Sequence, residues 1–417
     1  MPRSATYRYW PLTITGLFMF VGYLDRINIA VAAPTFAKAL HLDPSELGLV
    51  FSVFLVGYCL MPWPAGYLAD KIGARKVLSF ATGWFAVFSG LTAIGWNFVS
   101  LFVIRLLFGI GEGTGLPASL KANQNWSATH QRGVGSAIYL TGVCLGGALA
   151  PLFTVAIIAS FGWRAVFYIM AIPGVLVALL VWFYLKDRPQ EVLSESEIAR
   201  SGMAPPSEMP VSRALMYRSW SIWALYVGFF LFNVTYWGLA LWVPSYFAGV
   251  RHVNLSQLGI WSSLPWAGGL FGGYAAGWIG DIAPRRKYVL TACFMLAGIC
   301  SVLTYTASSG PTAVAFLTVG YFFMIGGAAS IYSLMMVLVG AEAAGAAMGS
   351  MYFFGILGGV VAPSVIGFIV QNTHSYAIPF GLMGGGIFVG GLVIATIRET
   401  RIDLSLRAHD LTAATAK

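Results

Sequence analysis

Twelve long apolar segments, separated by short polar stretches, follow one another along the whole chain. Each has about 20 or more mostly apolar residues without the alternation of a β-strand, which is the length and pattern of a bilayer-spanning helix. The predicted spans are residues 9–33, 47–67, 76–96, 98–122, 133–160, 163–185, 219–247, 256–280, 288–308, 311–339, 343–370 and 376–397. The pattern predicts an all-α integral membrane protein with twelve transmembrane helices.

The polar stretches between these spans differ in charge. Lys38, Arg164 and Arg251 are the few basic residues of one set of alternate loops. The other set and the chain ends carry Lys71, Arg75, Lys76, Lys121, Arg132, Lys186, Arg188, Arg200, Arg213, Arg218, Arg285, Arg286, Lys287, Arg398, Arg401 and Arg407. Because loops rich in Lys and Arg stay in the cytoplasm, we expect both termini to be cytoplasmic. Arg3 and Arg8 directly precede the first span, so no cleavable signal is expected.

The longest polar stretch lies near the middle of the chain and is rich in Pro, Ser and Glu. Such a composition is typical of a linker. We therefore divide the chain into an N-terminal six-helix bundle at 1–188, a cytoplasmic linker at 189–218, a C-terminal six-helix bundle at 219–398 and a cytoplasmic tail at 399–417.

Two patterns of the first half recur in the second half. Gly66-x-x-x-Asp70-x-x-x-x-Arg75-Lys76 returns as Gly277-x-x-x-Asp281-x-x-x-x-Arg286-Lys287, an offset of 211 residues (277 − 66). Gly146-Gly-x-x-Ala150-Pro151 returns as Gly358-Gly-x-x-Ala362-Pro363, an offset of 212 (358 − 146). Chance matching of Gly-rich segments is the alternative, but two patterns at nearly one offset favour a duplicated six-helix unit with pseudo-symmetric bundles.

The composition agrees with a membrane protein and narrows its chemistry. Of the 417 residues, 58% are hydrophobic and 9% are charged, whereas soluble domains carry about 25% charged residues. The net charge of +9 resides in the loops, so we expect no nucleic-acid partner. The spans contain no metal-ligand set, nucleophile–base pair or cofactor motif. We expect a monomer in the lipid bilayer with no metal, no cofactor and no catalytic residue.

Four charged residues fall inside spans, where ionisable groups are expensive and usually functional. Asp25 and Arg26 interrupt the first span, and Arg105 and Glu112 interrupt the fourth. Positions 105 and 112 are close to two helical turns apart, so we expect both side chains on one face. For Arg26, the neighbouring Asp25 and Asn28 offer local partners.

Two interpretations of these four charges stay open. One is a structural ion-pair network between the first and fourth spans. The other is a binding site for an anion and a proton, because the cluster is neutral when all four groups are ionised. A bound carboxylate would add an uncompensated negative charge at low dielectric, and protonation of Asp25 or Glu112 would remove it. Substrate and proton would then favour each other's binding.

The repeated loop pattern resembles the loop between helices 2 and 3 of the major facilitator superfamily. In the first half it reads Gly66-Tyr-Leu-Ala-Asp70-Lys-Ile-Gly-Ala-Arg75-Lys76. An acid there can pair with a basic residue or a helix N-terminus of the neighbouring bundle when the cytoplasmic side is shut. The gating residues that this resemblance implies are Gly66, Asp70, Arg75, Asp281 and Arg286.

Tyr23-Leu-Asp25-Arg26-Ile-Asn28 and Arg105…Gly109-Ile-Gly-Glu112 together resemble the anion:cation symporter branch of that superfamily. The branch includes bacterial galactonate and hexuronate carriers, sialin and the vesicular glutamate transporters. The resemblance implies alternating access in a bacterial inner membrane, with Asp25 and Glu112 carrying protons and Arg26 and Arg105 handling the substrate charge. Tyr58 falls where sugar-acid carriers have a substrate-contacting tyrosine, although a packing role is an alternative.

The second half offers rings rather than the amides found in many sugar-acid carriers. The candidate substrate contacts there are Asn233, Tyr236 and Tyr352. We expect proton-coupled symport of a small organic anion, either a sugar acid or a less hydroxylated or aromatic monocarboxylate. An organophosphate/phosphate antiporter is an alternative, disfavoured because no span of the second half contains a charge. A receptor or membrane enzyme is a further alternative, disfavoured because the chain has no sizeable soluble domain.

Overall fold

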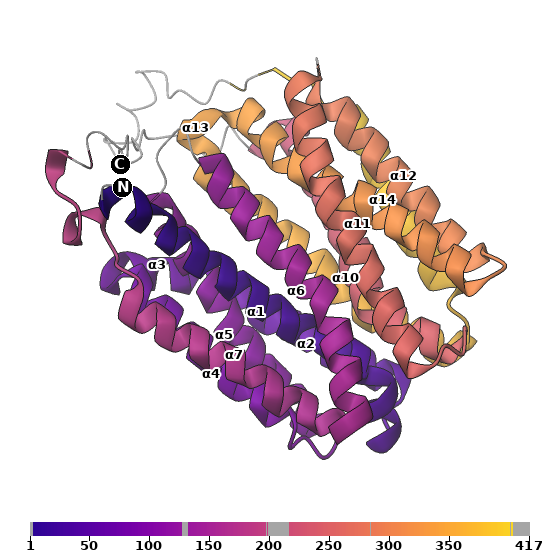
Figure 1. The fold of residues 1–417 in the computed structure, drawn as a ribbon. Coiled ribbons are helices and arrows are strands. Elements are labelled where there is room, and N and C mark those ends of the chain that lie inside the picture. The colour runs from indigo at the N-terminus through magenta and orange to yellow at the C-terminus, as the bar shows by residue number, and fades with distance from the viewer. Residues whose placement is uncertain are drawn as a thin grey trace, which may run out of the picture. The chain divides into compact units, whose positions relative to one another are not determined.

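The computed structural model describes residues 3–126, 132–196, 198, 217–283, 285–400 and 402, and within them the regular structure is helical throughout. Figure 1 shows the helices in chain order, from α1 in indigo to α14 in yellow. They are α1 (Arg3–Ala39), α2 (Pro44–Leu60), α3 (Pro62–Ile72), α4 (Ala74–Thr92), α5 (Phe98–Trp126), α6 (Arg132–Phe161), α7 (Trp163–Tyr184), η2 (Pro189–Glu191), α10 (Trp220–Gly249), α11 (Leu255–Ile282), α12 (Arg286–Thr306), α13 (Gly310–Thr373) and α14 (Ala377–Ala395).

The described helices include nine that are long and apolar enough to cross a membrane. The pair α2 and α3 is bent by 41° and makes a tenth if it is counted as one broken span. Helices α4 and α11 cover two further predicted spans but fall outside this set. The protein is therefore a multi-pass, all-helical membrane protein, and the number of twelve spans stays a prediction.

Two helix breaks have a local cause in the sequence. The helix of the predicted span 47–67 is broken at Met61, where α2 ends and α3 begins. Pro62 and Pro64 explain the break, because each proline lacks the backbone N–H that would bond to the carbonyl oxygen four residues earlier. Within α13, Gly340 has φ 73° and ψ 172°, a backbone conformation that glycine adopts readily. Gly340 separates two spanning segments, Gly310–Gly340 and Ala347–Thr373.

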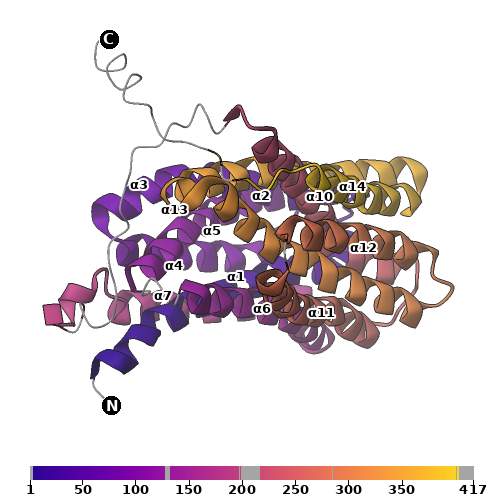
Figure 2. The same cartoon turned by 90° about the horizontal axis from the view of Figure 1, so that it is seen from above.

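Contacts divide the chain into two compact units. Unit 1 comprises Met1–Pro205, Trp237–Leu270 and Val360–Tyr376, and unit 2 comprises Pro206–Tyr236, Phe271–Gly359 and Ala377–Lys417. Within unit 1, α1 packs on α5, α6 and α7, and α4 packs on α5 and α7. Within unit 2, α12 and α14 pack along each other, as both views show (Figures 1 and 2). The predicted division at the 189–218 linker, most of which lies outside the described residues, stays a prediction.

A stripe of glycines brings α2 and α5 into close contact in unit 1. A Cβ atom at Gly109 would collide with the Phe54 carbonyl oxygen, and one at Gly113 would collide with the Tyr58 carbonyl oxygen. From the other side, a Cβ at Gly57 would collide with the backbone of α5. Small residues allow helix backbones to approach in this way. The stripe therefore sets Phe54 and Tyr58 directly against the helix that carries Arg105 and Glu112.

Each unit repeats one local contact at the start of a helix. In unit 1, Asp187 Oδ1 accepts a hydrogen bond of 2.8 Å from the backbone N–H of Arg75, at the start of α4. In unit 2, Glu399 Oε1 accepts one of 2.5 Å from the backbone N–H of Lys287, at the start of α12. A carboxylate satisfies the free amide groups of a helix N-terminus and is favoured by the helix dipole. The donor and the acceptor of the second hydrogen bond each lie 212 residues after those of the first (287 − 75 and 399 − 187). This common offset supports the predicted duplication of a six-helix segment.

Candidate functional site

The four intramembrane charges all lie in unit 1, on α1 and α5, and all are buried. The exposed fractions are 0% for Asp25, 4% for Arg26, 2% for Arg105 and 2% for Glu112. A buried charge is tolerated only when it is paired, hydrogen-bonded or neutralised. The partners of each group therefore decide what the cluster can do.

Arg26 and Glu112 form the ion pair of this cluster. Both Nε and Nη2 of Arg26 lie 2.7 Å from Glu112 Oε1, and Glu112 Oε2 is buried without a hydrogen-bond partner among the described residues. A Cβ atom at Gly22 would lie only 2.9 Å from Glu112 Oε1, so glycine leaves room on α1 for the carboxylate. Charge-assisted hydrogen bonds of this kind are stronger than neutral ones.

Within the part of the chain that the structure describes, Asp25 forms hydrogen bonds with neutral side chains rather than an ion pair. Its Oδ1 accepts hydrogen bonds from Ser89 Oγ on α4 at 2.7 Å and from Asn28 Nδ2 at 3.2 Å. Its Oδ2 is buried and has no hydrogen-bond partner among the described residues. The expectation that Asp25 and Asn28 serve Arg26 is therefore wrong: Asn28 bonds to Asp25, while Arg26 bonds to Glu112 on another helix. Ser89 was not anticipated, because a serine in an apolar span carries no signal that distinguishes it from ordinary packing.

Arg105 differs from Arg26 in having no carboxylate partner at hydrogen-bond distance among the described residues. Its Nε and Nη1 are buried and make no hydrogen bond to the described residues. Its Cζ lies 4.6 Å from the ring centre of Phe108 and 5.8 Å from that of Phe54, distances typical of cation–π contacts. Buried N–H groups nearly always have a partner, so an unpaired guanidinium is a candidate anchor for an anion.

Aromatic rings surround the guanidinium group of Arg26. Its Cζ lies 4.5 Å from the ring centre of Tyr58, 4.7 Å from Tyr23, 5.4 Å from Trp237 and 5.6 Å from Phe54, all within unit 1. Tyr58, a predicted substrate contact, thus lies against the charge cluster. Phe54 is a residue that sequence reasoning missed, because one ring in a Phe-rich span looks like any other.

The predicted contacts of the second half lie in unit 2. Asn233 Nδ2 donates to the Phe229 carbonyl oxygen at 2.8 Å. The ring of Tyr236 stacks on Phe232 with centres 5.5 Å apart, and the ring of Tyr352 lies 6.4 Å from that of Phe229. Asn233, Tyr236 and Tyr352 belong to an aromatic cluster of unit 2, and their role as substrate contacts stays a prediction.

Two of the predicted gating residues, Asp70 and Arg75, contact side chains of other helices in unit 1. Asp70 forms a salt bridge with Lys121 of α5. The Arg75 guanidinium lies 5.7 Å from the Trp182 ring centre, and a Cβ atom at Gly66 would meet open space. Arg286 is the first residue of α12, and the side chain of Asp281 lies outside the described residues.

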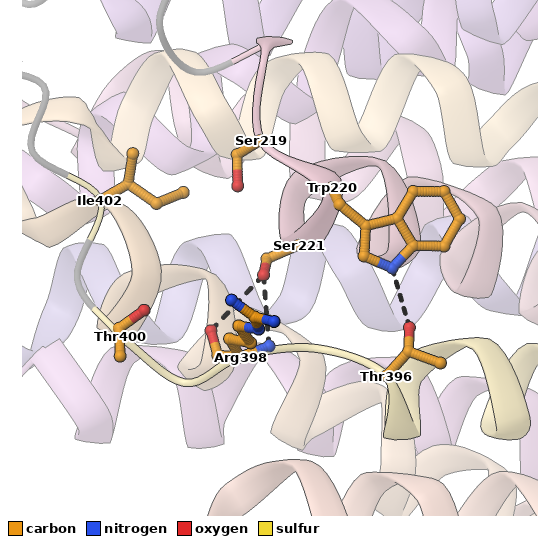
Figure 3. A pocket seen from close by; sticks show the side chains of 7 residues that line it. All are labelled: Ser219, Trp220, Ser221, Thr396, Arg398, Thr400 and Ile402. Atoms are coloured by element: carbon orange, nitrogen blue, oxygen red, sulfur yellow. Dashed lines mark hydrogen bonds between the residues drawn. The ribbon is translucent and has the colours of Figure 1, made fainter.

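A separate pocket of about 410 Å³ lies in unit 2, where α10 begins and α14 ends. In Figure 3, Trp220 Nε1 donates to Thr396 Oγ1 at 2.9 Å and the Arg398 backbone N–H donates to Ser221 Oγ at 3.3 Å. Its lining residues are Ser219, Trp220, Ser221, Thr396, Arg398, Thr400 and Ile402. None of the four buried charges lines it, so we do not assign it as the functional site.

The family model that describes the Major Facilitator Superfamily matches residues 15–363. The chain belongs to the Major Facilitator Superfamily. The hexuronate transporter of Bacillus subtilis (strain 168) is 29% identical over 401 residues, 92% of this chain and 94% of that protein. A probable sulfoacetate transporter of Cupriavidus necator is 31% identical over 409 residues, 94% of each chain. The protein is a membrane transporter of this superfamily and not an enzyme.

Among solved structures, the chain is similar to a bacterial homologue of the human lysosomal transporter Spinster in an inward-facing, occupied conformation. The TM-score is 0.79 at 17% sequence identity, and the match covers 96% of this chain and 99% of the other. At this identity the likeness concerns the fold alone. It agrees with the predicted major facilitator fold.

Proposed function

We propose that this transporter is a proton-coupled symporter of a small organic anion that works by alternating access. The observation that carries the proposal is the buried cluster in which Arg26 pairs with Glu112 while Arg105 has no hydrogen-bonded partner among the described residues. Asp25, Arg26, Arg105 and Glu112 sum to zero charge when all are ionised. An anion on Arg105 adds one negative charge at low dielectric, and a proton on Asp25 or Glu112 compensates it. Each ligand thereby favours the other.

The comparisons support an anion as the substrate. The two relatives are named for hexuronate and for sulfoacetate, both organic acids that are anionic at neutral pH. We propose that Arg105 binds the anionic group, that Asp25 and Glu112 carry the proton, and that Arg26 and Tyr58 complete the site in unit 1. We further propose that Asn233, Tyr236 and Tyr352 contact the substrate from the second half.

The proposed setting is a bacterial inner membrane, crossed by twelve spans with both termini in the cytoplasm and the protein acting as a monomer. The distribution of basic loop residues supports this topology. Gly66, Asp70, Arg75, Asp281 and Arg286 are proposed to make and break contacts at the cytoplasmic side as the bundles of 1–188 and 219–398 rock around the site.

The proposal is tested by transport into proteoliposomes that contain the purified full-length protein. A panel of labelled carboxylates is offered with an acidic exterior and a neutral interior, with and without a protonophore. We expect at least one anion to accumulate above its external concentration, and the protonophore to abolish the accumulation. Uptake of an anion that is indifferent to the pH gradient would contradict proton coupling, and absence of uptake for the whole panel would contradict anion transport.

Asp70→Asn is expected to shift the transporter between its access states without unfolding it. Asp70 and its partner Lys121 are 71% and 31% exposed, and an exposed ion pair contributes only about 0–1 kcal/mol to stability. The shift is measured as the labelling rate of single-cysteine reporters placed on each side of the membrane. Asp43→Asn is the matched control, because Asn also caps a helix well and Asp43 caps α2. Unchanged labelling and normal transport in Asp70→Asn would argue against a gate at this position.

A further inference from the structure

We propose that the preferred substrate is a monocarboxylate with an aromatic body, rather than a dianion or a polyhydroxylated acid. The inference rests on the proposed function and concerns the same site. It follows from two features of unit 1: Arg26 is paired with Glu112 among aromatic rings, whereas Arg105 lies against rings without a hydrogen-bonded partner among the described residues.

Arg26 is unsuited to a second anionic group. Two of its nitrogens are held by Glu112 Oε1 at 2.7 Å, and the ring centres of Tyr58, Tyr23 and Trp237 lie within 5.4 Å of its Cζ. Protonation of Glu112 during transport would remove the ionic attraction but none of these rings. A second carboxylate that approached Arg26 would have to displace both the acid and the ring contacts, and it would otherwise stay unpaired at low dielectric.

Arg105 by contrast offers one complete site for one carboxylate. Its buried Nε and Nη1 make no hydrogen bond to the described residues. The third nitrogen, Nη2, forms one edge of the planar guanidinium with Nε and another edge with Nη1. A carboxylate can therefore accept two parallel hydrogen bonds at either of these edges. The cluster thus supplies one available cation, which matches one negative charge on the substrate.

The described side chains that lie against the two guanidinium groups of unit 1 are mostly aromatic rings. Phe54 lies against both guanidinium groups, 5.6 Å from Arg26 and 5.8 Å from Arg105, and its ring also lies 6.2 Å from that of Trp237. The ring of Trp266 belongs to the same group of rings, and its centre lies 5.8 Å from that of Tyr23. Aromatic rings favour offset or edge-on contact with another ring.

Within the cluster, Asn28 Oδ1, Asp25 Oδ2 and Glu112 Oε2 are buried acceptors without a hydrogen-bond partner among the described residues, whereas the neutral donors are used. The Asn28 amide nitrogen and the Ser89 hydroxyl both donate to Asp25. These acceptors can serve a few substrate hydroxyls, whereas Phe54 and Phe108 beside Arg105 offer no partner to the further hydroxyls of a polyol chain, which then weaken binding. The rings beside Arg105 therefore favour an aromatic body over a long polyol chain.

Four anions test the proposal, because they vary the number of carboxylates independently of the type of substrate body. Phenylacetate and 4-carboxyphenylacetate differ by one carboxylate on a ring, and gluconate and glucarate differ by one carboxylate on a polyol. Affinity is measured by calorimetry on the purified full-length protein at one neutral pH. We expect phenylacetate to bind at least tenfold more tightly than each of the other three, a difference of about 1.4 kcal/mol.

The variant Phe54→Leu tests whether the ring that contacts both arginines causes the preference for an aromatic substrate body. Phe54→Leu keeps an apolar side chain but removes the ring, so we expect the phenylacetate-to-gluconate affinity ratio to fall at least threefold. The preference for one carboxylate over two should persist, because Arg105 is untouched. Phe98→Leu, at the start of the same α5 that carries Arg105, is the matched control, since the Phe98 ring packs against Phe102. Its affinity ratio should equal that of the wild type.

The outcomes separate this inference from the proposed function. Equal or tighter binding of 4-carboxyphenylacetate or glucarate than of its monoanionic partner overturns the single-charge inference. Gluconate binding at least as tightly as phenylacetate overturns the aromatic body. If none of the four binds while another anion of the transport panel accumulates with the pH gradient, the inference fails and the proposed function stands.

Discussion

Arg105→Lys is expected to lose substrate binding by at least tenfold, about 1.4 kcal/mol, although the positive charge is kept. The guanidinium offers two parallel N–H groups to a carboxylate, and an ammonium cannot reproduce that geometry. The buried nitrogens Nε and Nη1 make no hydrogen bond to the described residues, so the loss should appear in binding rather than in folding. Removal of Arg105 leaves the Arg26–Glu112 pair in place, because Glu112 bonds to Arg26.

The measurement is calorimetry on folded, monodisperse protein with the anion that gives the strongest uptake. Arg164→Lys is the control, since Arg164 is exposed and its guanidinium lies 4.3 Å from the ring centre of Trp163, away from the charge cluster. Arg26→Lys is measured beside it. Wild-type affinity in Arg105→Lys together with a large loss in Arg26→Lys would move the anchor to α1 and overturn the assignment.

Glu112→Gln is expected to abolish proton-driven accumulation while exchange of substrate across the membrane continues. Exchange never requires the proton to leave, whereas net symport does. The amide keeps the size of the side chain and an oxygen that can still accept from Arg26 Nε, so the fold should survive. Each pH unit of gradient drives about a tenfold accumulation when one proton is coupled, and the variant should lose all of it.

Two assays on the same proteoliposomes check this prediction. Uptake under an inward proton gradient measures coupling, and counterflow of labelled against unlabelled substrate measures exchange. Glu46→Gln is the matched control, because Glu46 closes the exposed capping box of α2 and Gln serves equally well there. Accumulation at wild-type rates in Glu112→Gln would exclude Glu112 as an obligatory coupling residue and leave Asp25 as the candidate.

The sequence was sufficient for those features that depend on one helix at a time. Long apolar runs predict spanning helices because a bilayer leaves no water for unpaired backbone groups. Asp25, Arg26, Arg105 and Glu112 stand out by the same argument, since every other charge can be placed outside a span. The repeated Gly66 and Gly146 patterns likewise predict an internal duplication, and the Asp187 and Glu399 contacts support it in three dimensions.

Only the tertiary structure decided which of these charges meet. The helical period places Arg105 and Glu112 on one face of α5, yet Glu112 pairs with Arg26 of α1 and Arg105 lies against Phe54 and Phe108. Pairing between helices depends on how closely and at what rotation they approach, and the period of a single helix contains no such information. Gly22 leaves space for the Glu112 carboxylate, and Gly109 leaves space for the backbone of α2. The residues that allow these close contacts are therefore glycines, which have no side chain. That is why the sequence by itself determined the members of the buried charge cluster, and the packing of α1, α2 and α5 determined their partners.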